Sequence, residues 1–211
     1  MKSLLSWYSV VVSPSFSTKD NICSAFLVEK NPLLGIFRNI IRRKRLTDFF
    51  EDSFCPDDII SSVLYLRNNL LYEIDNHNCQ SNLTKGISFM FPDPKSGSAL
   101  KRIFMFLRWM VRKDAIDFGI LKKIKTSELI IPLDTHTANI GRLLDMTSRK
   151  TNDLRCAIEI TDFLRKLEPD DPIRYDFAIA HIGITEGCRH SYNKIVCKDC
   201  ILSAFCDNRQ L

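Results

Sequence analysis

One segment of the chain, residues 99–113, is apolar on nearly every side of the helix that its residues predict. Its large apolar residues are Leu100, Ile103, Phe104, Met105, Phe106, Leu107, Trp109, Met110 and Val111. A helix without a polar face has to be buried among other elements. Ser96 or Ser98 is placed to cap this helix. The sequence therefore predicts a central helix, and the rest of the chain must supply the elements that cover it.

The segments available to cover the central helix are themselves helical. Apolar residues recur at helical spacing in residues 56–74 and 152–167. Asp134 is placed to cap a further helix over 135–144, and Asp170-Asp171-Pro172 is a typical start for a last one. Only seven glycines and eight prolines occur in 211 residues, too few for the many tight turns of an all-β fold. We therefore predict an all-α fold with short connections.

The composition excludes several other classes of protein. Hydrophobic residues make up 45% of the chain and charged residues 26%, which are ordinary values for a globular protein and exclude a disordered one. No apolar run reaches the ~18–20 residues that span a bilayer, so we do not expect an integral membrane protein. The net charge of +5 is compatible with a polyanionic partner without demanding one.

The eight cysteines are unevenly distributed along the chain. Four of them lie in the last 24 residues: Cys188, Cys197, Cys200 and Cys206. Four thiolates this close together do not easily form two unstrained disulfides, but they can wrap one soft metal centre. A structural Zn²⁺ and a 4Fe–4S cluster both satisfy this spacing. A metal site in a chain with its own core indicates a reducing, cytoplasmic location.

Basic residues are interleaved with these cysteines. Arg189, Lys194 and Lys198 give the metal loop cations that can contact phosphate groups. We expect three parts in the chain: a poorly defined amino-terminal helical segment over 1–55, a helical core over 56–187, and a metal loop with four cysteine ligands over 188–211.

Two features resemble the helix-hairpin-helix DNA glycosylases. Gly187-Cys188 followed by C-x2-C-x5-C resembles the iron–sulfur loop of the endonuclease III and adenine glycosylase branch, although that branch has six residues in the first gap and this chain has eight. Pro132-Leu133-Asp134-Thr135-His136 resembles the aspartate segment of the superfamily, and Lys101 matches its lysine. The separation of 33 positions between Lys101 and Asp134 resembles the archaeal 8-oxoguanine glycosylases. Residues 97–147 also look like a bacterial family of conserved hypothetical proteins.

The resemblance implies a two-lobed helical fold with the active site in a groove between the lobes. One lobe, from the middle of the chain, would carry Lys101, and the other would combine amino-terminal helices with the metal-bearing C-terminus. The implied reaction is excision of a damaged or mispaired base from double-stranded DNA, with abasic-site lyase activity. Lys101 would be the nucleophile. Asp134 would stabilise the sugar cation and assist proton transfer.

The resemblance also implies a structural 4Fe–4S cluster, a monomer and a nucleoid-associated location in the cytoplasm. Pro94-Lys95-Ser96-Gly97 stands where these glycosylases carry a Leu-Pro-Gly-x-Gly hairpin that grips phosphate. The residues expected to contact DNA are Gly97, Arg102, Arg189, Lys194 and Lys198.

Simpler interpretations remain open for the same residues. Asp134 is a good helix cap in any protein, and Lys101 can be a surface lysine at a helix start. Arg108 and Arg112 on the central helix are expected to pair with acids that follow them: Asp114, Asp117 or Glu128. The alternative functions are a non-enzymatic nucleic-acid-binding protein with a four-cysteine zinc site, and an iron–sulfur redox or sensor protein.

Overall fold

The computed structural model describes residues 46–76, 89, 91–184, 188, 193–198, 200, 202–203 and 205–206, all within the unit Arg45–Leu211. These residues form helices and no β-strand, and Lys113 and Phe118 make one isolated bridge. The all-α prediction is thus confirmed for the described part of the chain. None of the described helices is long and apolar enough to cross a membrane. Most of the segment 1–55 lies outside the described residues.

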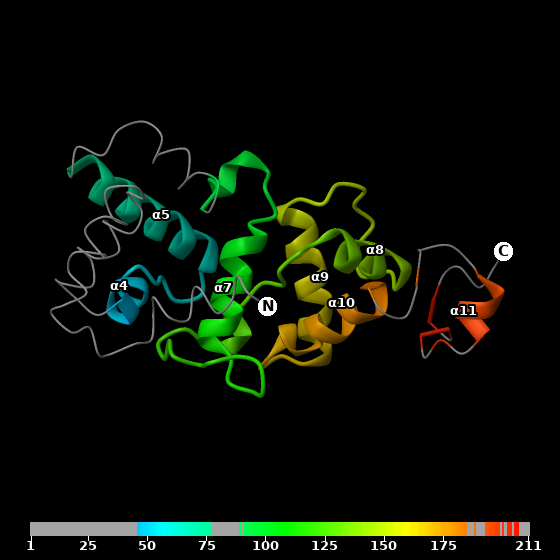
Figure 1. The fold of residues 1–211 in the computed structure, drawn as a ribbon. Helices are drawn as coiled ribbons and strands as arrows, with labels where there is room; N and C mark the ends of the chain where they lie inside the picture. Colours follow the sequence, from blue (N-terminus) through cyan, green and yellow to red (C-terminus); the bar gives the residue numbers. More distant parts are fainter. Residues whose placement is uncertain are drawn as a thin grey trace, which may run out of the picture. The chain divides into compact units, whose positions relative to one another are not determined.

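The described helices follow one another along the chain (Figure 1), but the connection over residues 112–134 is much longer than the short connections that the sequence predicts. The α-helices are α4 (Leu46–Asp52), α5 (Ile59–Asn76), α7 (Lys101–Val111), α8 (Thr135–Leu143), α9 (Leu154–Leu167), α10 (Asp176–Ile184) and α11 (Lys194–Lys198). Three short 3-10 helices are η2 (Pro94–Ser96), η3 (Thr126–Glu128) and η4 (Pro172–Tyr175). The helix predicted from residue 56 begins at Ile59, because the Asp58 carboxylate accepts a hydrogen bond from the N–H of Ser61 at 2.9 Å.

The helix α7 is the central one, as its sequence predicts. Ile103, Phe104 and Leu107 are almost completely buried. On one face, Phe106 packs against Phe50 of α4, with ring centroids 4.9 Å apart. The opposite face meets the segment before α8 and the start of α10 through its charged side chains, which are described below. The helix α7 therefore joins the α4–α5 part of the structure to the α8–α10 part (Figure 1).

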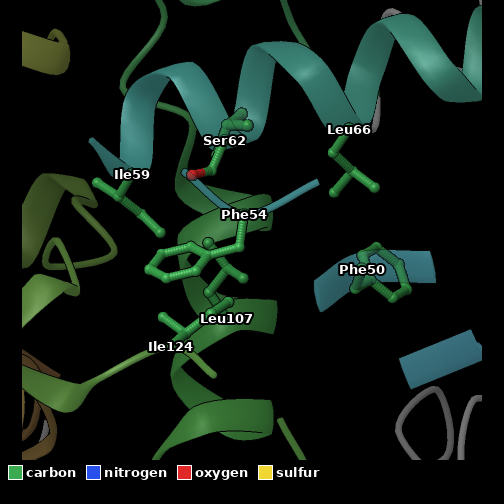
Figure 2. A pocket seen from close by; sticks show the side chains of 8 residues that line it. Phe50, Phe54, Ile59, Ser62, Leu66, Leu107 and Ile124 are labelled. Atoms are coloured by element: carbon green, nitrogen blue, oxygen red, sulfur yellow. The ribbon is translucent and has the colours of Figure 1, made fainter. Parts of the chain in front are cut away.

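A small apolar pocket lies where α4, α5 and α7 meet (Figure 2). Its lining residues are Phe50, Phe54, Ile59, Ser62, Val63, Leu66, Leu107 and Ile124. The hydroxyl of Ser62 already donates to the carbonyl of Asp58 at 2.9 Å and accepts from the N–H of Cys55 at 2.8 Å. Because the only polar side chain of the pocket is engaged, the pocket is a gap in core packing rather than a site that could orient a polar ligand.

The helices α8, α9 and α10 form a packed group. The helix α10 contacts α8 extensively, and η4 lies against α9. Gly141 allows α8 to approach α9 closely, since a Cβ atom there would lie 2.7 Å from the Cδ1 of Ile160. The segment 129–133, which leads into α8, is buried. The N–H of Ile131 in that segment donates to Thr161 Oγ1 of α9 at 3.0 Å, and Thr161 donates to the carbonyl of Ala157 at 2.7 Å.

We expect Thr161→Val to destabilise the fold by about 1–3 kcal/mol. Valine has nearly the same shape but cannot accept the hydrogen bond of the buried Ile131 N–H, and that donor would be left without its partner. The free energy of unfolding, measured by urea titration, checks this. Thr161→Ser keeps the hydroxyl and serves as the matched variant. Equal stability of the valine and serine variants would contradict the prediction.

Candidate active site

Lys101 and Asp134, which the sequence predicts as site residues, meet in the structure. The Nζ atom of Lys101 lies 3.3 Å from Oδ2 of Asp134, although 33 positions separate them along the chain. The side chain of Lys101 is 43% exposed and that of Asp134 is 22% exposed. The pair is therefore anchored in the fold and can still be reached from solvent.

Asp134 uses its two carboxylate oxygens differently. It is the N-cap of α8, and its Oδ1 accepts a hydrogen bond from the N–H of Thr137 at 2.8 Å. Its Oδ2 faces Lys101. The cap predicted for Asp134 is confirmed, and the cap does not compete with the ion pair. Capping also orients the carboxylate, so that its other oxygen points toward Lys101.

The surroundings of Asp134 favour its ionised form. Partial burial opposes ionisation, but the hydrogen bond from the Thr137 N–H and the positive charge of Lys101 outweigh it, and together they hold the pKa of Asp134 below its ordinary value of 3.8. The site therefore contains a carboxylate that stays negatively charged at neutral pH and in mild acid.

The chain before Lys101 follows an uncommon path. Leu100 has a positive φ of 53° and is 1% exposed, and a buried leucine in the left-handed region is rare and costs free energy. Ser98 does not cap α7 as predicted: its Oγ accepts the N–H of Leu100 at 3.2 Å, and the N-cap residue, Leu100, has no capping side chain. Gly97 has a φ of 78°, a backbone conformation that residues with a side chain rarely adopt, so glycine is favoured at this position. The space around it is open, because a Cβ atom there would meet nothing within 4 Å.

The residues predicted to contact DNA are placed as follows. Arg102 is exposed beside Lys101, and its guanidinium lies 3.9 Å from the centre of the Phe89 ring. Lys194 and Lys198 are exposed on α11. Arg189 lies outside the described residues. Of the predicted site residues, the structure brings Lys101 and Asp134 into contact, with Arg102 next in the chain.

The four cysteines predicted as metal ligands are partly buried free thiols in the structure. The N–H of Asn193 lies 3.3 Å from the Sγ of Cys197. Among the described residues, no three His, Cys, Asp or Glu side chains are grouped as a metal would require. The metal site therefore stays a prediction from cysteine spacing.

A buried group of charged residues lies further along α7. Arg108 contacts Asp117 at 3.3 Å and makes a very short contact with Asp176 of α10. Arg112 contacts Asp117 at 2.6 Å and Asp171 at 3.0 Å. Arg112 also contacts Asp114 at 2.9 Å, so the predicted pairing with Asp114 and Asp117 is confirmed. Glu128, the third acid suggested by the sequence, instead accepts backbone N–H groups of Asp57 and Lys125.

Asp171 and Asp176 are the two residues of this group that sequence reasoning missed, and Asp176 is the more buried of them. Its side chain is 8% exposed, and burial raises its pKa to about 6, although Arg108 opposes the shift. The negative charges of Asp134 and Asp117 add to the increase. The only signal in the sequence is an acidic residue in the first turn of a helix, and that is common.

Comparison with known proteins gives one result. Residues 28–185 match the family described as Protein of unknown function (DUF2400). The chain belongs to the DUF2400 family. The match to DUF2400 includes Lys101, Asp134 and Asp176 and ends before Cys188, the first of the four tail cysteines. No curated protein and no solved structure matches the chain.

Proposed function

We propose that this DUF2400 protein is a DNA base-excision glycosylase with abasic-site lyase activity. The observation that supports the proposal is the 3.3 Å contact between a partly exposed amine, Lys101 Nζ, and an ionised carboxylate, Asp134 Oδ2. These are the two groups that cleavage of an N-glycosidic bond followed by Schiff-base chemistry requires. The proposal includes a two-lobed glycosylase-like arrangement, in which a nucleotide extruded from duplex DNA reaches this pair through a groove.

In the first step, the bond between C1′ of the sugar and the base breaks, and its electron pair leaves with the base, which takes up a proton. Positive charge develops on the sugar. The carboxylate of Asp134 stabilises this charge in a partly dry site, and its orientation is fixed in advance by the Thr137 N–H. No reorganisation of the carboxylate is then needed when the charge develops.

In the second step, Lys101 Nζ forms a bond to C1′. The amine must give up a proton to act as a nucleophile, and Asp134 Oδ2 lies close enough to accept it. Opening of the sugar ring then leaves a protonated Schiff base between Lys101 and C1′. Loss of a proton from C2′ expels the 3′ phosphate by β-elimination, and hydrolysis of the Schiff base releases the lysine.

Duplex DNA is the proposed partner. Arg102, exposed beside Lys101, and Gly97, around which a Cβ would find open space, are the described residues near Lys101 that we propose approach the DNA backbone. The net charge of +5 supports this, since cations that contact phosphate release counterions. We also propose that the four tail cysteines hold a structural 4Fe–4S cluster or zinc, on the basis of their spacing. Iron and zinc analysis of the purified protein, with its visible absorption spectrum, tests that part.

The decisive experiment is borohydride trapping. The native protein is incubated with duplexes that carry an oxidised, alkylated, deaminated, mismatched or abasic site, in the presence of sodium borohydride. We expect a covalent protein–DNA adduct, because the reductant converts the Schiff base into a stable amine. Absence of an adduct with every duplex, together with salt-dependent duplex binding, would instead favour the non-enzymatic binding protein.

We expect Asp134→Asn to slow base release by about 100-fold while leaving the fold intact. Asparagine caps helices as well as aspartate does and can still accept the Thr137 N–H, but it has no charge to stabilise the sugar cation. The rate of base release is measured under single-turnover conditions, with the duplex that gives an adduct with the native protein. Thermal unfolding of the variant checks its fold. If the Asp134→Asn variant has the same unfolding midpoint as the native protein and also releases base at the same rate, this role for Asp134 is ruled out.

A further inference from the structure

We propose that Asp176 is a positioning residue for the Lys101–Asp134 pair: through its buried contact with Arg108, it fixes the helix group that carries Asp134 against the helix that carries Lys101. Its effect on the reaction rests on the proposed function, whereas its effect on the geometry of the pair does not.

Two cations of α7 are spaced by two helical turns. Lys101 and Arg108 are seven residues apart, so they lie on the same face, about 10 Å apart along the helix axis. Each meets a carboxylate at the start of a different helix: Lys101 meets Asp134, the cap of α8, and Arg108 meets Asp176, the first residue of α10. Two ion pairs therefore hold the α8–α10 group against α7.

The two ion pairs differ in how firmly they can hold. The Lys101–Asp134 pair is partly exposed, and an exposed pair contributes little to fixing geometry. The side chains of Arg108 and Asp176 are each only 8% exposed. Because α10 packs extensively on α8, a fixed position for Asp176 also fixes the start of α8. The buried pair thus sets the geometry, and the exposed pair remains free to react.

Charged groups of three neighbouring elements act on Asp176. Arg108 contacts it from α7, and the negative charges of Asp117, in the loop after α7, and of Asp134, at the start of α8, oppose its ionisation. Arg174 of η4 is directed to Glu168 instead, at 2.8 Å. Arg108 is therefore the cation that holds Asp176 in its ionised form, and uptake of a proton by Asp176 would weaken the contact that fixes α10.

The test compares Asp176→Asn with Asp171→Asn. Asp171 offers a matched control, because it also contributes one carboxylate to the same cluster but contacts Arg112, one turn further from Lys101. The probe is an abasic-site duplex with sodium cyanoborohydride, which reduces Schiff bases in mild acid. We expect Asp176→Asn to lower the trapping rate at saturating duplex by about tenfold without changing the half-saturating concentration, because misplacement of reacting groups slows chemistry. Asp171→Asn should trap at the native rate, and Asp176→Glu should recover part of the loss.

The pH profile separates positioning from a general loss of stability. The pKa of Asp176 is raised to about 6, so below that pH the native protein carries a neutral Asp176, as the asparagine variant does at every pH. The native rate divided by the Asp176→Asn rate should therefore fall from about ten at pH 7.5 toward one at pH 5. A ratio that stays constant with pH, or an Asp171→Asn variant with the same profile, would overturn the proposal.

A second measurement requires no activity. The amide proton of Thr137 donates to Asp134, so its NMR shift reports on the placement of that carboxylate. We expect the Thr137 amide shift at pH 7 to change in Asp176→Asn and to stay near its native value in Asp171→Asn. If the native protein forms no adduct but the Thr137 shift responds in this way, the proposed function fails and the positioning role stands. If the native protein forms the adduct and Asp176→Asn traps at the native rate with an unchanged Thr137 shift, the positioning role fails.

Discussion

Replacing Lys101 with arginine is expected to abolish the borohydride-trapped adduct, with a loss of at least about 1,000-fold. Arginine keeps a positive charge close to Asp134 and can preserve the ion pair that the structure shows at 3.3 Å. The guanidinium group stays protonated at the pH of the assay, however, and cannot form a Schiff base. The variant should therefore retain the native fold and duplex affinity while losing covalent chemistry. Gel separation of labelled duplex from the adduct measures the effect.

The matched control for this prediction is Lys95→Arg. Lys95 is an exposed lysine in η2, six positions before Lys101. Among the residues that the structure describes, its side chain makes no ion pair with Asp134. It should trap like the native protein, which would show that the loss in Lys101→Arg belongs to one amine and not to lysines in general. Undiminished trapping by Lys101→Arg would remove Lys101 from the reaction, since some other amine would then form the Schiff base.

The sequence predicts the central helix and the Asp134 cap because both depend on local rules. A segment that is apolar all round has to be buried, and an aspartate before a helix accepts a nearby N–H whatever lies around it. The contact between Lys101 and Asp134 is of another kind. No periodicity joins residues 33 positions apart, and the expectation that these two meet rests on the resemblance alone; the structure places the two side chains in contact.

The role of Asp176 could not be predicted from the sequence. Its environment depends on Arg108, 68 positions earlier in the chain, and on how closely α10 packs against α7 and α8. The sequence predicts nearby acids as partners for Arg108, and these include Asp117 but not Asp176. The start of α7 shows a similar limit. The sequence predicts Ser96 or Ser98 as its cap, but the N-cap residue is Leu100, a buried leucine in the left-handed region, and no local rule predicts that conformation.

Replacing Arg108 with methionine is expected to lower the free energy of unfolding by about 3–5 kcal/mol at pH 7. Methionine fills a similar volume but leaves Asp176 and Asp117 buried without the guanidinium that both contact. Urea titration measures the change. Arg102→Met serves as the control, because Arg102 is exposed on the same helix and its loss should alter stability by no more than about 0.5 kcal/mol.

The same variant should lose less stability in mild acid. The native protein already holds the pKa of Asp176 at about 6, above its ordinary value of 3.8, mainly because the carboxyl group is buried. The folded state therefore binds this proton more tightly than the unfolded state, so protonation of Asp176 stabilises the fold as the pH falls through 6. Without Arg108, which favours the ionised form, the pKa rises further and the carboxyl group is neutral at pH 5. The deficit of Arg108→Met should then be smaller at pH 5 than at pH 7 by about 1–2 kcal/mol. An equal deficit at both pH values would mean that Arg108 does not compensate a buried negative charge at Asp176, and the basis for assigning Asp176 a positioning role would be lost.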